Sequence, residues 1–357
     1  MPSSTATATA NGYTFKSNSA GQIRTSKVSP KIFKEAHNQI YGQKHNDWRD
    51  DFTRDGYVVI KGVIPTERAL GYRKRMLDYL KTFDNPELDY KDNSTWIAEN
   101  LPAHNPHNIF FYYSCIHEDF AWEVRTEPGV LESFAKLWNT EELLVSFDGF
   151  NVSFPNRPDQ PPFPAWPHID QSPLKEGLQC AQGIVSLSKS SAEDGTLVVL
   201  KGSNNLVSEF FEKEVGRENW YKYEEDAYRF TQEEYNYFLE KGCEVVKVEV
   251  DPGDLIIWDS RTIHWGQAPT VDSHRIRAAV YASYTPRNFA TDETLQVKAD
   301  VFKHWLGTTH WAHDNIKPRL VTPILPDGSI DPRDRSEPKQ PPELNDTILK
   351  LAGVIPY

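Results

Sequence analysis

The sequence predicts a mainly β protein with flanking helices, built as a double-sheeted jelly roll, and two observations predict this fold. Between about residues 143 and 284 the chain holds several short apolar runs rich in β-branched residues, separated by turn signals such as Asp-Gly and Pro-Gly. Helical periods are few in the same half of the chain. Chains of 357 residues that fold as β-barrels often form one domain, so we expect a single domain here.

The two ends of the chain differ from its middle in composition. Residues 1–28 are rich in Ser, Thr, Ala and Asn and contain almost no bulky apolar side chains, so we expect a disordered lead. Residues 29–357 should form the single domain, with helical insertions and a C-terminal extension from about 290 to 357.

The first elements of the domain follow from helix stop signals and β-branched content. A short helix is expected from Trp48, ending at Gly56, and residues 57–60 then form a strand. A second helix begins near Thr66, a plausible N-cap, and its apolar period continues through Phe83. We expect this helix to pack on the outside of a sheet.

The middle of the chain combines loops with a few regular segments. Residues 83–128 are irregular and aromatic, as the walls of binding sites often are. We expect a helix at residues 128–138 and a strand at residues 143–152. Residues 155–167 contain six prolines, which exclude a helix or central strand and indicate a stiff loop that leads to His168.

Further strands alternate with turn signals down to residue 284. Each expected strand is apolar or β-branched, and the Asp-Gly and Pro-Gly pairs between them supply turn chemistry. The expected strands are 180–187, 196–200, 245–250, 255–258 and 277–284, with a charged, partly helical insertion at 210–242.

Composition limits the partners and the compartment. The formal net charge of −12 argues against nucleic acid and anionic membrane surfaces. No apolar run approaches the roughly 20 residues that a membrane span needs. The N-terminus also lacks the order of a basic segment followed by an apolar one that is typical of a signal peptide. We expect a cytoplasmic monomer or homodimer that acts on a small molecule. Cys115, Cys180 and Cys243 are widely spaced, so we expect buried free thiols.

A His-x-Asp pair at His168 and Asp170 is half of a possible metal site. Residues two apart on an extended segment project from the same face, so one imidazole and one carboxylate can occupy adjacent corners of a metal's coordination sphere. His264, where a later strand resumes after a small turn, can supply the third ligand, because strands of a jelly roll converge in space. This 2-His-1-carboxylate pattern suits non-haem Fe(II).

Two arginines follow the distal histidine. Arg275 and Arg277 lie at the start of the last expected strand, and a guanidinium matches the planar geometry of a carboxylate. Either residue could anchor the far carboxylate of a dicarboxylic keto acid.

The motifs occur together in an order that resembles the phytanoyl-CoA dioxygenase family of Fe(II)/2-oxoglutarate-dependent oxygenases, over roughly residues 45–290. The segments that carry the resemblance are 48–62, 168–170, 194–203, 252–255, His264 and Arg277. The resemblance implies a double-stranded β-helix of the cupin-like jelly-roll type and the use of Fe(II), 2-oxoglutarate and O2.

The resemblance also assigns roles to particular residues. It implies that His168, Asp170 and His264 bind the iron and act in catalysis. It favours Arg277 over Arg275 as the anchor of 2-oxoglutarate, and it suggests that Gln182 contacts this cosubstrate.

The reaction expected from the resemblance is C–H oxidation of a small molecule, by hydroxylation, desaturation or oxidative cyclisation. Members of the family often act in secondary metabolism, on amino acids, alkaloids or terpenoids. Phe163, Trp166 and Tyr112 are nominated as walls of the substrate site.

Two other readings of the sequence compete with this one. A second histidine cluster, His304, His310 and His313, could indicate a metal-dependent hydrolase or a structural zinc site, since the last two would share a helix face. Alternatively the chain could be a non-catalytic jelly-roll metal-binding module, which a degraded metal or anchor position would favour, and the sequence contains no such degradation.

Overall fold

The computed structural model describes residues 6–10, 13–17, 28–216, 219 and 226–357. The expected disordered lead falls largely outside this part of the chain, so its disorder stays a prediction. Within the lead the structure describes an antiparallel pair, β1 (Ala6–Ala10) and β2 (Tyr13–Ser17).

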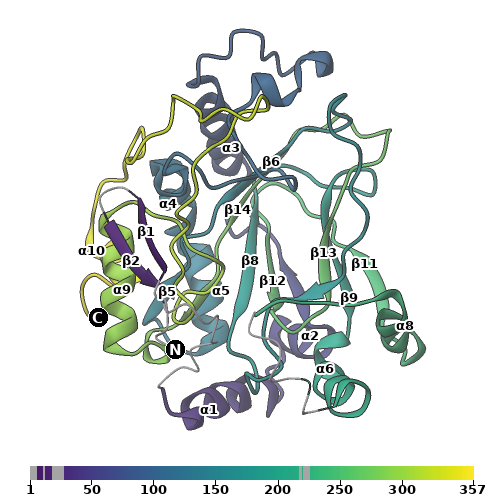
Figure 1. Ribbon diagram of the computed structural model, residues 1–357. Coiled ribbons are helices and arrows are strands. Elements are labelled where there is room, and N and C mark those ends of the chain that lie inside the picture. The colour runs from purple at the N-terminus through teal and green to yellow at the C-terminus, as the bar shows by residue number, and fades with distance from the viewer. Residues whose placement is uncertain (1–5, 11–12, 18–27, 217–218, 220–225) are drawn as a thin grey trace.

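Two antiparallel sheets form the centre of the protein (Figure 1). The larger has the strand order β3-β12-β8-β14-β6-β4, with β15 and β5 beside it, and the smaller has the order β10-β7-β13-β9-β11. Larger-sheet strands are β3 (Tyr57–Ile60), β4 (Ile109–Phe110), β5 (Leu143–Val145), β6 (Phe150–Ser153), β8 (Ala181–Ser186), β12 (Leu255–Asp259), β14 (Arg277–Tyr281) and β15 (Tyr284–Pro286). Smaller-sheet strands are β7 (His168–Ile169), β9 (Thr196–Lys201), β10 (Tyr228–Arg229), β11 (Glu244–Lys247) and β13 (His264–Gln267).

Successive strands alternate between the two sheets from β6 to β9 and again from β11 to β14. The chain passes from β8 in the larger sheet to β9 in the smaller one, and again from β11 to β12, β13 and β14. This alternation is that of a jelly roll, so the predicted double-stranded β-helix is confirmed. The turn signals that join neighbouring strands in the sequence therefore lead the chain across to the other sheet at β8–β9 and β11–β12.

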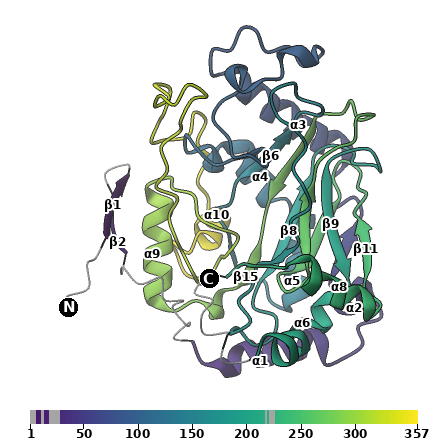
Figure 2. The same ribbon diagram turned by 45° about the vertical axis from the view of Figure 1, so that its right-hand side comes forward.

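Helices surround the sheets on their outer sides. Figures 1 and 2 show α3, α4 and α5 beside the larger sheet, and α6 and α8 beside the smaller one. The helices are α1 (Pro30–Tyr41), α2 (Trp48–Asp55), α3 (Thr66–Lys81), α4 (Asp119–Arg125), α5 (Pro128–Trp138), α6 (Val207–Phe210), α8 (Gln232–Glu240), α9 (Asp292–Lys303) and α10 (Asp346–Leu351). Short 3-10 turns lie at 93–95, 98–100, 115–117, 203–205 and 287–289, and a π turn at 211–215.

The predicted start and stop signals hold with one exception. Helix α2 ends at Gly56, whose φ of 82° lies in the left-handed region, and a Cβ there would come within 2.4 Å of Thr262 Oγ1. The N-cap prediction was wrong by one residue: α3 begins at Thr66 itself, and Pro65 occupies the cap. Pro65 has no side-chain acceptor, and it joins the helix through its backbone carbonyl, which accepts from the Ala69 N–H at 3.0 Å.

Two segments that were each predicted as a single strand are divided into two strands in the structure. The predicted strand 143–152 is broken into β5 and β6, which pair with different strands: β5 pairs with β15, and β6 pairs with β14. The predicted strand 277–284 is likewise divided into β14 and β15. Helix α4 lies in the stretch that we expected to be irregular.

The apolar core has three main layers. One fills the space between the sheets and contains Ile184, Leu197, Val199, Val248, Val250, Ile256, Trp258 and Ala279. A second lies between the larger sheet and its helices and includes Phe134, Phe150 and Val185, and a third packs the smaller sheet against α6 and α8 and includes Leu200, Phe210 and Phe238. Because both faces of β8 are covered, all six of its residues are buried, and none of them carries a charged side chain.

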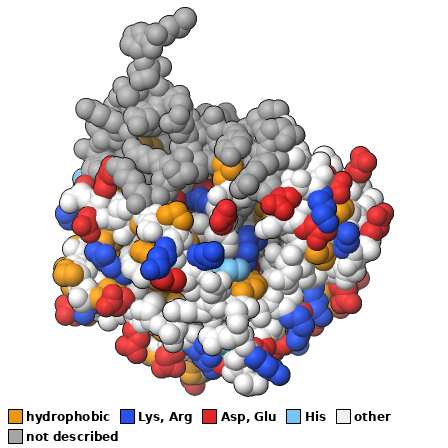
Figure 3. Space-filling model, turned by 90° about the horizontal axis from the view of Figure 1, so that it is seen from below, with side chains coloured by type: hydrophobic (Ala, Val, Ile, Leu, Met, Phe, Trp, Pro, Cys, Tyr) orange, Lys and Arg blue, Asp and Glu red, His pale blue; other side chains and the backbone are white. Residues whose placement is uncertain are grey.

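The described surface mixes charges of both signs. On the face seen in Figure 3, acidic and basic side chains are interspersed without an extended basic area among the residues drawn in colour. No helix in the part of the chain that the structure describes is long and apolar enough to cross a membrane.

Candidate metal centre

Two neighbouring strands of the smaller sheet bring the distant histidines together. His264, the first residue of β13, lies directly opposite His168, the first residue of β7. Asp170 follows β7, and its N–H donates to Ser260 O at 2.9 Å, which ties it to the turn before β13. One ligand atom from each of these three side chains lies within 4.8 Å of the others.

The three side chains converge through their outer atoms. His168 Nε2 is 3.6 Å from Asp170 Oδ1, and His264 Nε2 is 3.3 Å from Asp170 Oδ2. The histidines are 5% and 4% exposed. Two imidazole nitrogens and a carboxylate oxygen on one side of a point form the donor set that fits Fe(II) and leaves further coordination positions free.

Backbone carbonyls select the histidine tautomers that a metal needs. His168 Nδ1 lies 3.0 Å from Trp166 O, and His264 Nδ1 lies 2.8 Å from Thr262 O. A carbonyl oxygen can only accept, so each Nδ1 must carry the proton. Both Nε2 lone pairs are then available for a metal.

The protonation states also favour metal binding. Burial and the neighbouring His168 lower the pKa of His264, which keeps this imidazole neutral. Burial alone would raise the pKa of Asp170, but the neighbouring His168 and His310 imidazoles hold this pKa well below its usual value. The site therefore contains a carboxylate and a neutral distal imidazole, the forms that act as ligands.

Gln182 makes a contact that we did not expect. From β8, its Nε2 donates to Asp170 Oδ2 at 3.0 Å. The described contact of Gln182 is therefore with the candidate metal carboxylate, and a contact with the cosubstrate stays a prediction. A hydrogen bond of this kind orients a carboxylate ligand and holds its ionised form.

Arg277 is a buried cation without an anionic partner. It is 8% exposed, and its Nη1 donates to Asn151 Oδ1 at 2.5 Å. Within the part of the chain that the structure describes, no carboxylate forms an ion pair with it, and burial lowers its pKa. A buried guanidinium that only neutral groups satisfy is costly, so this position favours an anionic ligand.

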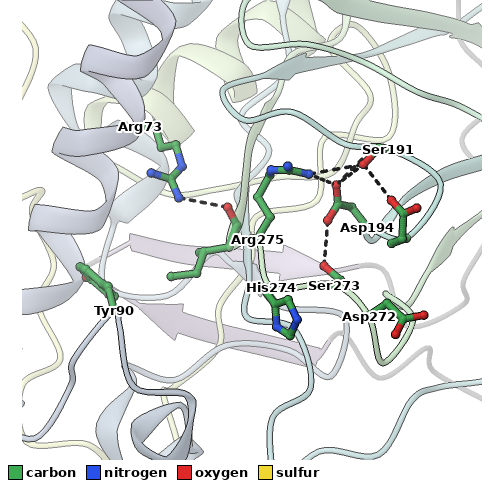
Figure 4. A pocket seen from close by; sticks show the side chains of 10 residues that line it. Arg73, Tyr90, Ser191, Asp194, Asp272, Ser273, His274 and Arg275 are labelled. Carbon is green, nitrogen blue, oxygen red and sulfur yellow. Dashed lines mark hydrogen bonds and ion pairs between the residues drawn. The ribbon is translucent and has the colours of Figure 1, made fainter.

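Arg275 lies in a different environment. Its guanidinium pairs with Asp194 and its side chain is 42% exposed. Figure 4 shows it pointing toward Asp194 and Ser191, at the edge of a cavity of about 450 Å³. The lining of that cavity contains none of the three candidate ligands and not Arg277.

The second histidine cluster does not assemble. Helix α9 ends at Lys303, and the following segment is not helical, so His310 and His313 share no helix face, contrary to the expectation. His313 Nδ1 lies 3.1 Å from Thr285 Oγ1, whereas His310 Nε2 lies 3.2 Å from Asp170 O. Among the described residues, His168, Asp170 and His264 are the only group of three or more His, Cys, Asp or Glu side chains close enough to share a metal.

An aromatic stack covers one of the candidate ligands. The Trp166 ring lies 4.1 Å from the His168 ring at an interplanar angle of 6°, and His107 stacks on Trp166 at 4.6 Å. Phe163 meets His107 edge-on at 4.9 Å. Tyr112 packs instead against Phe111 and Tyr113.

The cysteines have no part in this centre. Cys115, Cys180 and Cys243 are free and buried, as the sequence predicted.

The fold and the site together define a jelly-roll protein with a buried 2-His-1-carboxylate constellation, the architecture of non-haem iron oxygenases. The chain belongs to the phytanoyl-CoA dioxygenase (PhyH) family, whose model matches residues 52–279. It is a non-haem Fe(II)/2-oxoglutarate-dependent dioxygenase that uses iron, 2-oxoglutarate and O2.

Individual proteins extend the comparison. The chain is 39% identical over 286 residues to the "Ava biosynthesis cluster protein O" of Aspergillus versicolor, covering 79% of this chain and 90% of that protein. The "Putative Oxidoreductase from Salmonella typhimurium LT2" has a similar fold, with a TM-score of 0.52, 15% identity, and coverage of 78% of this chain and 79% of that one. The epimerase SnoN in complex with Fe3+, alpha ketoglutarate and nogalamycin RO is less similar, with a TM-score of 0.45, 16% identity, and coverage of 72% and 85%.

Proposed function

We propose that His168, Asp170 and His264 bind the catalytic Fe(II). The observation that carries this proposal is the convergence of two buried Nε2 lone pairs on one ionised carboxylate, with every ligand atom within 4.8 Å of the others. When bound, iron supplies the activation of O2 that is coupled to decarboxylation of 2-oxoglutarate to succinate and CO2. The chain's own contribution is to orient the ligands, which Trp166 O, Thr262 O and Gln182 do by hydrogen bonds.

Arg277 anchors the far carboxylate of 2-oxoglutarate in this proposal. Its support is the guanidinium's burial without a described anionic partner, whereas Arg275 is already paired with Asp194. A bidentate guanidinium–carboxylate pair in a desolvated site would compensate the cost of burying this charge. Asn151, which accepts a hydrogen bond from Arg277, would keep the guanidinium oriented before the cosubstrate enters.

The substrate in this proposal is a small or mid-sized apolar molecule of secondary metabolism, of the amino acid, alkaloid or terpenoid class, and the reaction is C–H oxidation. The aromatic stack of Trp166, His107 and Phe163 next to His168 supports an apolar substrate, which such rings would position by packing. Similarity to a protein of a biosynthesis cluster supports the metabolic setting. Hydroxylation is favoured over desaturation and cyclisation, because it needs only one site of oxidation on the substrate.

Substrate-triggered succinate formation tests this function. The protein is incubated with Fe(II), 2-oxoglutarate and ascorbate, and succinate is measured across a panel of amino acids, alkaloids and terpenoids. We expect some members of the panel to raise succinate formation well above the substrate-free rate, and His264→Ala to abolish both rates. Equal succinate formation by the parent protein and His264→Ala would refute the assignment of this ligand.

A further inference from the structure

A segment that follows the part of the chain matched by the family model contacts the candidate metal centre. The family model ends at residue 279, and α9 and the segment that follows it lie outside this match. His310, in that segment, places its Nε2 3.2 Å from the backbone carbonyl oxygen of Asp170. Since a carbonyl oxygen only accepts, the His310 ring donates this hydrogen bond.

This contact is one of three hydrogen bonds that hold Asp170. Its N–H donates to Ser260 O at 2.9 Å, its Oδ2 accepts from Gln182 at 3.0 Å, and its C=O accepts from His310. The three partners come from three separate parts of the chain. Strand β7 ends one residue earlier and contains only two residues, so sheet pairing does not hold Asp170 in place.

The segment that carries His310 is itself fixed to the loop after Asp170. Lys175 forms ion pairs with Asp314 at 3.0 Å and with Asp226 at 3.1 Å, and all three side chains are less than 10% exposed. The Lys175 ammonium also lies 3.8 Å from the centre of the Trp311 ring. A buried charge cluster of this kind holds the two segments in one relative position, because separating one partner leaves an uncompensated charge.

We propose that the C-terminal extension is part of the metal site, with His310 acting as a positioning residue that fixes the Asp170 peptide and so directs its carboxylate to the metal. This inference rests on the proposed function, in which Asp170 is an iron ligand. The ring N–H of His310 is the functional feature, since it limits rotation of the peptide unit that follows Asp170. Outer partners of this kind change metal affinity through the ligand that they orient.

Two substitutions of His310 distinguish the effect of its hydrogen bond from the effect of its packing. His310→Phe keeps a ring of similar size but removes the N–H donor, whereas His310→Gln removes the ring but keeps an amide N–H of similar reach. His304→Gln is the matched control, because this histidine lies in the same extension and its Nδ1 bonds to Asp300 O in its own helix, at 2.7 Å. Asp170→Ala tests the underlying ligand assignment.

The measurement is an anaerobic titration of the metal-free protein with Fe(II) in the presence of 2-oxoglutarate, followed by the visible charge-transfer absorption of the complex. We expect His310→Phe to weaken Fe(II) binding by about 10- to 100-fold and to shift this absorption band. His310→Gln and His304→Gln should stay close to the parent. Thermal unfolding of each metal-free variant accompanies the titration, and a single cooperative transition shows that the variant is folded when its Fe(II) binding is measured.

Two results would overturn the inference. One is parental Fe(II) binding and absorption in His310→Phe, and the other is a greater loss in His310→Gln than in His310→Phe, which would assign the effect to packing. If Asp170→Ala loses Fe(II) while His310→Phe does not, this inference alone fails. If Asp170→Ala binds Fe(II) like the parent, the proposed function fails with it.

Discussion

Replacing Arg277 by Gln is the sharpest test of the cosubstrate site. The change removes the charge and leaves a shorter, neutral amide in place of the guanidinium that donates to Asn151 Oδ1. Arg275→Gln is the matched control, because it makes the same substitution two residues earlier, at a side chain that is 42% exposed and paired with Asp194. The pair therefore compares a buried free cation with a half-exposed paired one.

The expected losses of 2-oxoglutarate affinity in the two variants differ by at least about sixfold. Losing one partner of a desolvated charge pair costs about 2 to 5 kcal/mol, so 2-oxoglutarate binding should weaken by roughly 30- to 5000-fold in Arg277→Gln. The Arg275–Asp194 pair is partly solvated, and such pairs contribute up to about 1 kcal/mol, so any indirect effect on 2-oxoglutarate should stay below about fivefold.

The assay is an anaerobic titration of the Fe(II)-loaded protein with 2-oxoglutarate, by absorption or calorimetry. Iron affinity is measured separately, so that a change at the metal is not mistaken for a change at the anchor. Removal of an uncompensated buried charge should also leave the metal-free protein at least as stable as the parent. A larger loss in Arg275→Gln than in Arg277→Gln would refute the reasoning and transfer the anchor to Arg275.

Three further predictions concern the metal, the reaction and acid stability. Alanine substitution at His168, Asp170 or His264 should each abolish turnover and Fe(II) binding, measured by metal analysis after desalting; normal iron content in any of them would remove that residue from the ligand set. With the true substrate under 18O2, the product should carry the label, and an unlabelled dehydrogenated or cyclised product would exclude hydroxylation. Burial lowers the pKa of His117 from 6.5 to about 3, so the unfolded chain binds a proton that the folded one excludes, and stability should fall as the pH drops from 6.5 toward 3. A His117→Leu variant should lose less stability over that range in urea unfolding experiments, and an equal loss would contradict this account.

Local signals in the sequence were sufficient for much of the fold. Gly56, the proline-initiated helix α5 and the proline-rich loop before His168 act through their own backbone chemistry, so the sequence predicts them directly. Strands were predicted from β-branched content. The three candidate ligands could also be found in the sequence, because a His-x-Asp pair and a distal histidine are recognisable from their residue types.

The sequence by itself therefore determined the strand and helix content, the jelly-roll class and the candidate metal ligands. Only the tertiary structure decided that Arg277 is buried in β14 while Arg275 lies in the preceding loop, paired with Asp194. It also decided that Gln182 and His310 both contact Asp170. The physical reason is that burial and long-range hydrogen bonds depend on which sheet a strand joins and where the chain returns, and neither is encoded by neighbouring residues.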